Sequence, residues 1–209
     1  MILTISGFAG TGKSTVLDLI HARLGNNYTC IHSGNVFRAW AQRCELDVRE
    51  FALRAPGDEH MLAVINAVMD EQAAALGIEL PAEASSERDP DHKLDWLTKA
   101  AMLKPGARLL VEGRSGAFLA LKLAIPAFNV RLVAHPRECA SRVVAREGGD
   151  FNGQLERIQR REEENRARFR HLYKCDLERL PYDLVVDTTE RTPQQVAQYI
   201  LDTCGQPID

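Results

Sequence analysis

Gly7-Phe8-Ala9-Gly10-Thr11-Gly12-Lys13-Ser14 is the stretch of sequence that decides the fold. It fits G-x-x-x-x-G-K-[ST], the loop that cradles phosphate groups between a strand and a helix. The β-rich run Leu3–Ser6 precedes it, and apolar residues at helical spacing follow from Val16 to Leu24, before Gly25. We therefore expect a phosphate-binding loop (P-loop). A glycine turn that binds nothing is the less favoured alternative.

The residue types of this loop suit a nucleotide polyphosphate and a metal ion. Glycines let the backbone curl so that successive N–H groups face one concavity, and the following helix adds its positive dipole end. Lys13 is expected to reach the β- and γ-phosphates, and the Ser14 hydroxyl to ligate Mg²⁺. The predicted cofactors are therefore ATP and Mg²⁺. The predicted cofactor-binding residues are Gly7, Gly10, Thr11, Gly12, Lys13, Ser14 and Thr15.

Length and charge narrow the class of protein further. The chain has 209 residues and a formal net charge of −3, which fits one α/β domain. Nucleic-acid-binding domains are usually basic, so we expect a small-molecule partner and no nucleic acid. No apolar run reaches about 18 residues, and the chain enters its first predicted strand at once. We therefore expect no membrane span, no signal peptide and a cytoplasmic location. The five cysteines include no C-x-x-C pair, which favours buried reduced thiols.

Five short runs are predicted to be strands. Their ranges are Leu3–Ser6, Tyr28–His32, Arg108–Glu112, Val130–Ala134 and Leu184–Asp187. Several are apolar without alternation, which is typical of a sheet covered on both faces. Helical segments separate most of them. The pattern predicts an α/β fold with a five-stranded parallel, doubly wound sheet flanked by helices, and with its active site at the carboxyl ends of the strands.

The remaining segments give helix and loop predictions. Glu59–Leu76 is predicted to be one amphipathic helix, and Leu80–Arg88 a loop. Asp89-Pro90 is predicted to open the next helix. The last helix carries a capping box, with Thr192-Pro193 at its start and Gln195 completing the box.

A second phosphate site is predicted after the second strand. Ser33–Arg38 reads as a glycine turn followed by a helix that carries an arginine. A guanidinium fork matches phosphate oxygens, so Arg38 can hold a second phosphate group. An ordinary surface arginine is the alternative, and the nearby P-loop favours the phosphate site.

Glu112 ends the third predicted strand, and Gly113 and Arg114 follow it. An acidic residue at the end of a buried strand is where such enzymes hold Mg²⁺. Gly113 allows a close approach, and Arg114 is expected to face the same site. A helix-capping carboxylate is the alternative role for Glu112.

An arginine-rich segment runs from Arg142 to Arg170 and is interrupted by Gly148-Gly149. A charged helix is most often a solvated face stabilised by i,i+4 pairs. Phosphoryl transfer, however, needs cations that close over the transferring group and exclude water. We therefore expect a hinged lid.

Together these motifs resemble the cytidylate kinase family of nucleoside monophosphate kinases, particularly its compact archaeal-type branch. The likeness covers residues 1–52 and 104–205. It implies that Arg38 and Arg114 bind the phosphate of the acceptor, and that Arg161 and Arg168 are lid arginines. Asn165 stands where members of the family often carry a carboxylate thought to help read the pyrimidine.

The resemblance implies a single P-loop kinase domain over residues 1–209. The implied parts are a core of 1–34 and 104–205, an acceptor-binding helical segment of 35–103 and a lid of 137–170. The predicted catalytic residues are Lys13, Arg142, Arg146, Arg161 and Arg168. The predicted acceptor-binding residues are Ser33, Gly34, Arg38, Arg114 and Asn165, and the predicted metal ligands are Ser14 and Glu112.

The expected reaction is transfer of the γ-phosphoryl group of ATP to CMP or dCMP, giving the diphosphate and ADP. The middle segment is about one helix longer than in the compact relatives, so a kinase of another small acceptor, such as a modified nucleotide, is an alternative. A nucleotide-dependent switch is less favoured, because the sequence has no [NT]-K-x-D run. We expect a monomer or a weak dimer.

Overall fold

A parallel sheet of five strands forms the centre of the computed structural model, which describes residues 1–205. The strand order is β2-β3-β1-β4-β5. The strands are β1 (Ile2–Gly7), β2 (Thr29–His32), β3 (Leu109–Glu112), β4 (Phe128–Val133) and β5 (Leu184–Asp187). The predicted α/β class and five-stranded parallel sheet are confirmed, and β5 has the predicted bounds.

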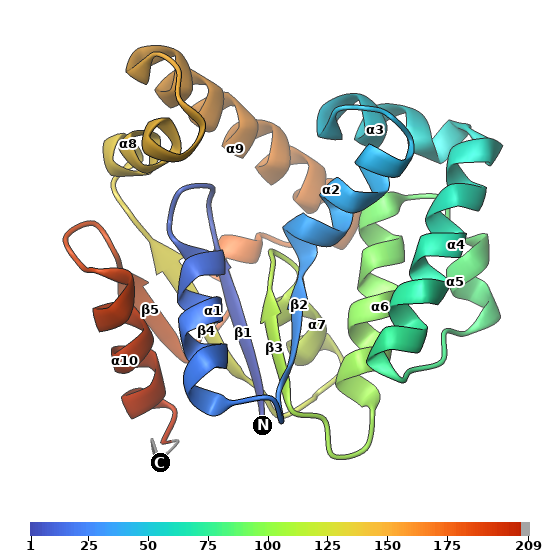
Figure 1. Ribbon diagram of the computed structural model, residues 1–209, viewed down its shortest axis with the longest axis horizontal. Coiled ribbons are helices and arrows are strands. Elements are labelled where there is room, and N and C mark those ends of the chain that lie inside the picture. The colour runs from blue at the N-terminus through green and yellow to red at the C-terminus, as the bar shows by residue number, and fades with distance from the viewer. Residues whose placement is uncertain (206–209) are drawn as a thin grey trace.

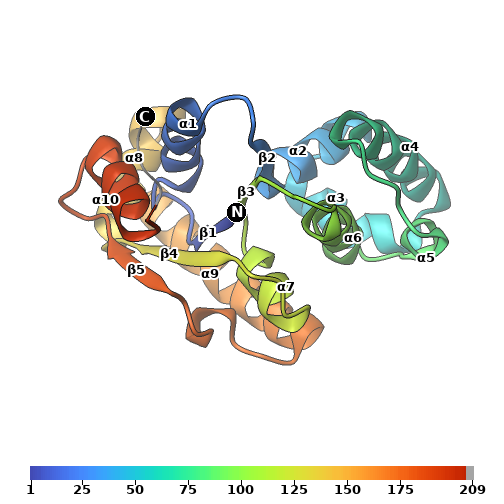
Figure 2. The same cartoon turned by 90° about the horizontal axis from the view of Figure 1, so that it is seen from below.

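Helices cover both faces of this sheet (Figures 1 and 2). On one face, α1 (Lys13–Leu24) and α10 (Pro193–Thr203) pack against β1, β4 and β5 in a shared apolar core. On the other face, α7 (Gly116–Lys122) and the end of α6 (Pro90–Leu103) pack against β1, β2 and β3. Burial on both faces explains why the strands are apolar without alternation.

A lobe of helices lies beside β2 and has an apolar core of its own around Trp40, Phe51 and Ile65. Its elements are α2 (Ser33–Arg43), α3 (Val48–Arg54), η1 (Ala55–Gly57), α4 (Glu59–Leu76), α5 (Ala82–Ser86) and α6. The bounds predicted for α4 are confirmed. Asp89 caps α6 by accepting the N–H groups of residues 91 and 92, as the Asp-Pro pair predicts.

The prediction of a loop over Leu80–Arg88 is wrong for its middle part, which forms α5. Ala84 is fully buried against the core of the lobe. The ammonium group of Lys93 donates to the carbonyl groups of Ala84 (3.0 Å) and Ser85 (3.2 Å). A cation at the last carbonyl groups stabilises a short helix, and it comes from a distant element that local sequence does not reveal.

The arginine-rich segment forms α8 (Pro136–Glu147) and α9 (Phe151–Tyr173), and the break falls at the predicted glycines. Gly148 and Gly149 have φ angles of 77° and 97°, a region that disfavours other residues. Asp150 then caps α9 through the N–H of Gly153 at 2.8 Å. From α8, α9 crosses over the carboxyl ends of the strands towards the helical lobe (Figure 1).

The chain closes with η2 (Leu177–Arg179), β5 and α10. The predicted capping box of α10 is present, with Thr192 and Gln195 bonded in both directions. Within residues 1–205, no helix combines the length and the apolar character that a bilayer crossing requires.

Candidate active site

The P-loop connects β1 to α1 at the carboxyl edge of the sheet. Gly10 and Gly12 have φ angles of 80° and 88°, and a Cβ at Gly10 would lie 2.6 Å from the carbonyl oxygen of Cys139. Gly12 caps α1 without any side-chain hydrogen bond, so the first N–H groups of the helix are left for another acceptor. A helix start in this state is a ready site for an anion.

Two threonines complete the loop region. Thr11 is buried, and its hydroxyl donates to the carbonyl of Phe8 at 2.8 Å, which fixes the shape of the loop. Thr15 is exposed in the first turn of α1.

Lys13 lies beneath the loop with its ammonium group close to protein atoms. Nζ donates to the carbonyl of Phe8 at 2.7 Å and is 3.9 Å from Glu112 Oε1. Burial lowers the pKa of Lys13 to about 8; Glu112 opposes the shift and Arg114 adds to it. An anion bound beside Lys13 would stabilise the charged ammonium group and raise this pKa again.

Ser14 and Glu112 place two oxygen ligands side by side, with Ser14 Oγ 3.3 Å from Glu112 Oε2. β1 and β3 pair in a register that sets Ile5 beside Glu112, which brings the carboxylate to the start of the P-loop. Burial acts to raise the pKa of Glu112, but His32 and Lys13 outweigh it and hold that pKa below its ordinary value. A hydroxyl and an ionised carboxylate suit Mg²⁺, which takes few protein ligands and completes its shell with phosphate and water.

His32 belongs to this group although the sequence did not single it out. Its Nε2 is 3.3 Å from Asp18 Oδ1, and its Nδ1 is 3.6 Å from Glu112 Oε2. Contact with Glu112 raises the pKa of His32 against the effect of burial, and Asp18 acts in the same direction. The strand register could have revealed this residue, because His32 and Glu112 end neighbouring parallel strands and pair with each other.

Ser33, a predicted acceptor residue, meets Gly113 just beyond the ends of β2 and β3. A Cβ at Gly113 would collide with the hydroxymethyl group of Ser33, so only glycine permits this approach. Beside them, Gly34 leaves room for the guanidinium of Arg38, which also bonds Asn35 Oδ1 at 2.5 Å. The predicted glycine turn is wrong, because Ser33 and Gly34 already belong to the first turn of α2, which begins directly after β2 and carries Arg38.

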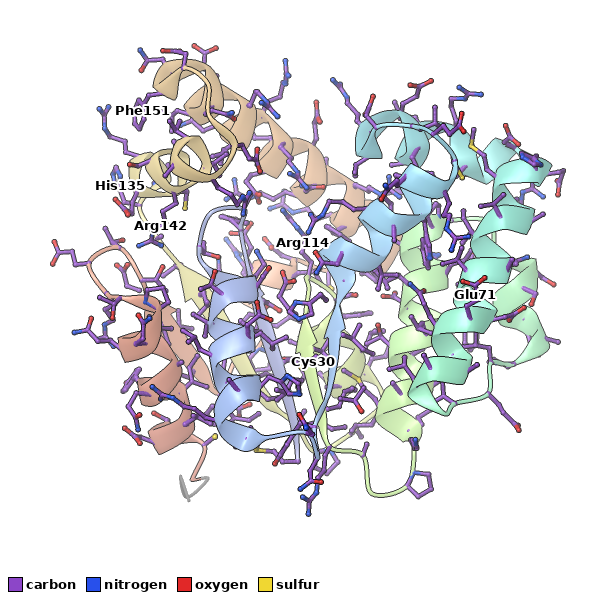
Figure 3. The ribbon with its side chains drawn as sticks, in the orientation of Figure 1. Cys30, Glu71, Arg114, His135, Arg142 and Phe151 are labelled. Atoms are coloured by element: carbon purple, nitrogen blue, oxygen red, sulfur yellow. The ribbon has the colours of Figure 1, made fainter. Side chains whose placement is uncertain are left out.

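Arg114 and Arg161 lie near Lys13, and Arg38 lies near Arg161. Arg114 lies between the P-loop and α2 (Figure 3) and pairs with Glu162 at 2.8 Å. Partial burial, together with repulsion from Arg114 and Arg38, lowers the pKa of Arg161. Within residues 1–205, Arg161 has no hydrogen-bond or ion-pair partner. Cations held this close in a protein form a strong site for a polyanion.

Glu162 is a carboxylate seated where an anion is expected. It is buried, and its Oε1 accepts the backbone N–H of Ala9 in the P-loop at 3.3 Å as well as the Arg114 pair. Its Oε2 is buried with no hydrogen-bond partner. The sequence could not separate Glu162 from Glu163 and Glu164 beside it, because only the rotation of α9 decides which one faces the loop.

The other predicted catalytic arginines make different contacts. Arg142 binds the Thr188 carbonyl at 2.6 Å and the Gly10 carbonyl at 3.4 Å, so it ties the P-loop to the end of β5. Arg146 pairs with its neighbour Glu147 at 2.5 Å on the surface. Arg168 pairs with Asp91 of α6 at 2.5 Å.

Comparison with known proteins agrees with this geometry. The model of the cytidylate kinase-like family matches residues 2–190. The chain belongs to this family. The cytidylate kinase of Methanothermobacter thermautotrophicus is 32% identical over 193 residues, covering 90% of this chain and 95% of the relative. That of Thermoplasma acidophilum is 27% identical over 201 residues, covering 96% and 90%.

Membership of the cytidylate kinase-like family makes the chain a phosphotransferase with a nucleotide-binding P-loop. A crystal structure of an uncharacterized protein from Eubacterium ventriosum aligns with a TM-score of 0.56 and 11% identity, covering 97% of this chain and 96% of that one. At that identity the likeness concerns the fold alone.

Proposed function

We propose that this chain is an ATP-dependent nucleoside monophosphate kinase that phosphorylates CMP or dCMP to the diphosphate. The observation that carries the proposal is the gathering of Lys13, Arg38, Arg114 and Arg161 around one P-loop. Four cations from four parts of the chain suit the polyphosphate of ATP and the single phosphate of the acceptor brought end to end. The relatives named cytidylate kinase support the choice of acceptor.

Phosphoryl transfer depends on positioning the two substrates and neutralising their charge, and it needs no covalent catalysis by the enzyme. The phosphate of the acceptor is already an anionic nucleophile, so no enzyme intermediate is required. The P-loop N–H groups and Lys13 hold the β- and γ-phosphates, while Arg38 and Arg114 hold the acceptor. Arg161 then neutralises charge on the transferring group. Mg²⁺, held by Ser14 and Glu112, supplies further charge neutralisation when it is bound.

Arg114 must change partners for this to happen. In the structure it is paired with Glu162, whose carboxylate also accepts the backbone N–H of Ala9 in the P-loop. The acceptor phosphate takes over Arg114, since charge-assisted bonds from arginine to phosphate are strong and bidentate. A catalytic role for Arg142, Arg146 and Arg168 stays a prediction, because each is bonded elsewhere and has to be released by a lid movement.

A coupled assay of ADP release tests the proposal. Purified protein with ATP and Mg²⁺ is offered CMP, dCMP, UMP, AMP and GMP, and we expect CMP or dCMP to give the highest kcat/KM. A lack of turnover on all five would refute the proposal. A modified nucleotide as acceptor is the second candidate, favoured by the long segment 35–103, and the same assay run over non-standard acceptors distinguishes the two.

A further inference from the structure

A cavity lies on the side of α9 that faces β1, β4 and η2. Arg166, Phe169 and Arg170 of α9 line it, and their spacing of i, i+3 and i+4 places them on one side of the helix. Arg161 and Arg168 stand at i and i+7 on a different side. The cavity has an empty volume of about 430 Å³, which includes its open mouth. It therefore opens on a different flank of α9 from the lid arginines and has room for one small ring.

One wall of the cavity contains a buried hydroxyl group that has no partner. Ser6 of β1 is 3% exposed, and within residues 1–205 its Oγ makes no hydrogen bond. Burial raises the pKa of Tyr182 and Ser6 opposes that shift, so the two hydroxyl groups are near each other. The Tyr182 hydroxyl, however, donates to the Leu177 carbonyl at 2.7 Å. An unpaired buried hydroxyl costs free energy, and an acceptor atom of a ligand would remove that cost.

The other walls are built from aromatic rings and guanidinium groups. The ring of Phe8 in the P-loop has three guanidinium groups around it, at 5.9, 6.0 and 4.7 Å from its centroid, which belong to Arg114, Arg131 and Arg166. Arg114 also lies 5.6 Å from the centroid of Phe169. Planar groups of both kinds stack favourably on another flat π system. The walls therefore favour a flat aromatic ligand over a saturated one.

The charges around the cavity do not balance. The lining contains four arginines and two carboxylates, namely Arg114, Arg131, Arg166, Arg170, Asp176 and Glu178. Glu178 pairs with Arg131 at 3.0 Å and also with Arg166, so one carboxylate serves two guanidinium groups. Arg114 has its partner Glu162 outside the lining, which leaves one positive charge in excess. A ligand with a single negative charge would balance it.

We infer that this cavity is a second ligand site, which takes a single aromatic ring that carries a carboxylate. The ring packs against Phe8 and Phe169, and a carboxylate oxygen accepts from Ser6 Oγ. The carbonyl of Phe8 accepts from Lys13 Nζ at 2.7 Å, so a ligand in the cavity touches the loop that holds Lys13. The inference goes beyond the proposed function and does not depend on it, because binding requires no turnover.

Titration calorimetry of the full chain with benzoate tests the site. We expect a Kd of about 1 mM or lower. Cyclohexanecarboxylate has the charge without the flat ring, and benzamide has the ring without the charge, so each should bind at least about tenfold more weakly. Ser6→Ala should weaken benzoate binding about tenfold, since it removes a hydrogen bond to a charged group. Cys175→Trp places an indole in the cavity lining and should abolish binding.

Benzoate could also bind to the cations of the phosphate site, so Arg161→Ala is the control. Arg161 lies on the other flank of α9, and its removal should leave the benzoate affinity unchanged. Alkylation by iodoacetamide, followed by mass spectrometry of the peptides, locates the ligand without any substitution. Benzoate should slow the labelling of Cys175, which lines the cavity, and not that of Cys44 in the helical lobe. Both are half-buried free thiols.

No binding of benzoate, equal affinity for the three probes, loss of binding in Arg161→Ala or equal protection of the two thiols would overturn the inference. If Cys175→Trp does not fold, Ser6→Ala and the alkylation experiment decide the question. A protein that binds benzoate in this way but phosphorylates no nucleotide would refute the proposed function and leave the second site standing.

Discussion

The two ends of α9 differ in charge and in the partners of their side chains. At the P-loop end, Arg161 has no partner within residues 1–205, and Arg114 has only Glu162. At the other end, Arg168 is held by carboxylates of α6, and the Tyr173 hydroxyl donates to Asp95 at 2.9 Å. One end therefore keeps an excess of positive charge, while the other is nearly balanced.

The difference shows where a charged ligand and where a neutral one is expected. Burial first, and then repulsion from neighbouring arginines, makes the charged forms of Lys13 and Arg161 unfavourable and lowers the pKa of both groups. A bound anion would offset that cost. Balanced donors and acceptors bind a neutral heterocycle without large charge changes. We call the P-loop end of α9 the phosphate end, after the ligand group proposed for it, and the other end the balanced end.

Lys13→Ala gives the largest expected effect on the phosphate end. It removes the cation beneath the P-loop and should lower kcat by at least about 10³-fold. The midpoint temperature of thermal unfolding should be unchanged or slightly higher, since the substitution removes an ammonium group whose burial is unfavourable. Steady-state kinetics and a melting curve followed by circular dichroism check both parts. A collapse of the fold would assign Lys13 to structure instead of chemistry.

Substitutions at Arg161 and Arg168 compare the two ends directly. Arg161→Ala should lower kcat by about 10²- to 10³-fold. Folding stability should change little, because the substitution breaks no hydrogen bond or ion pair seen within residues 1–205. Arg168→Ala should act mainly on the KM of the acceptor. If Arg168→Ala lowered kcat as much as Arg161→Ala, then Arg168 would be a lid arginine that reaches the phosphoryl group, as the resemblance implies.

The two ends also differ in how far the sequence predicts them. The P-loop and the strand ends depend on local patterns, so the sheet and the position of Lys13, Ser14 and Glu112 follow from spacing alone. Glu162, His32 and Asp91 depend on helix rotation, strand register and the docking of α6 on α9. Such long-range contacts leave no local signal, and the same holds for Lys93 and the short helix that it stabilises.

Asp95 of α6, which accepts from Tyr173 at the balanced end of α9, is expected to have an effect of intermediate size on the pH dependence of folding stability. Burial raises its pKa to about 6, with hydrogen bonds from Ser115 and Tyr173 opposing the shift. A carboxyl group with a raised folded-state pKa destabilises the fold once it ionises, so stability should fall as the pH rises from about 4 to about 6. The cost above pH 6 is about 3 kcal/mol.

Asp95→Asn should remove this dependence, because the amide stays neutral while still accepting from Tyr173. Urea unfolding of both proteins between pH 4 and 7 measures the difference, which cancels the titration of other groups. The two curves should coincide near pH 4 and separate towards pH 6. Parallel curves over the whole range would contradict the assignment.

The smallest expected effect is a fraction of a proton taken up at the phosphate end. Burial lowers the pKa of Lys13 to about 8, and a bound polyphosphate would raise that pKa by direct attraction. At pH 9 the binding of ADP should therefore take up protons, and affinity should weaken as the pH rises above 8. At pH 7 Lys13 is already charged and takes up almost none.

Calorimetry in two buffers of different ionisation enthalpy measures this uptake. The phosphates of ADP are fully ionised at pH 9, because their last pKa lies near 6, so they do not obscure the result. Lys13→Arg keeps its charge at both pH values and should bind ADP without uptake. Equal uptake by the wild type and this variant would place the titrating group elsewhere, and the lysine would then be charged before the nucleotide arrives.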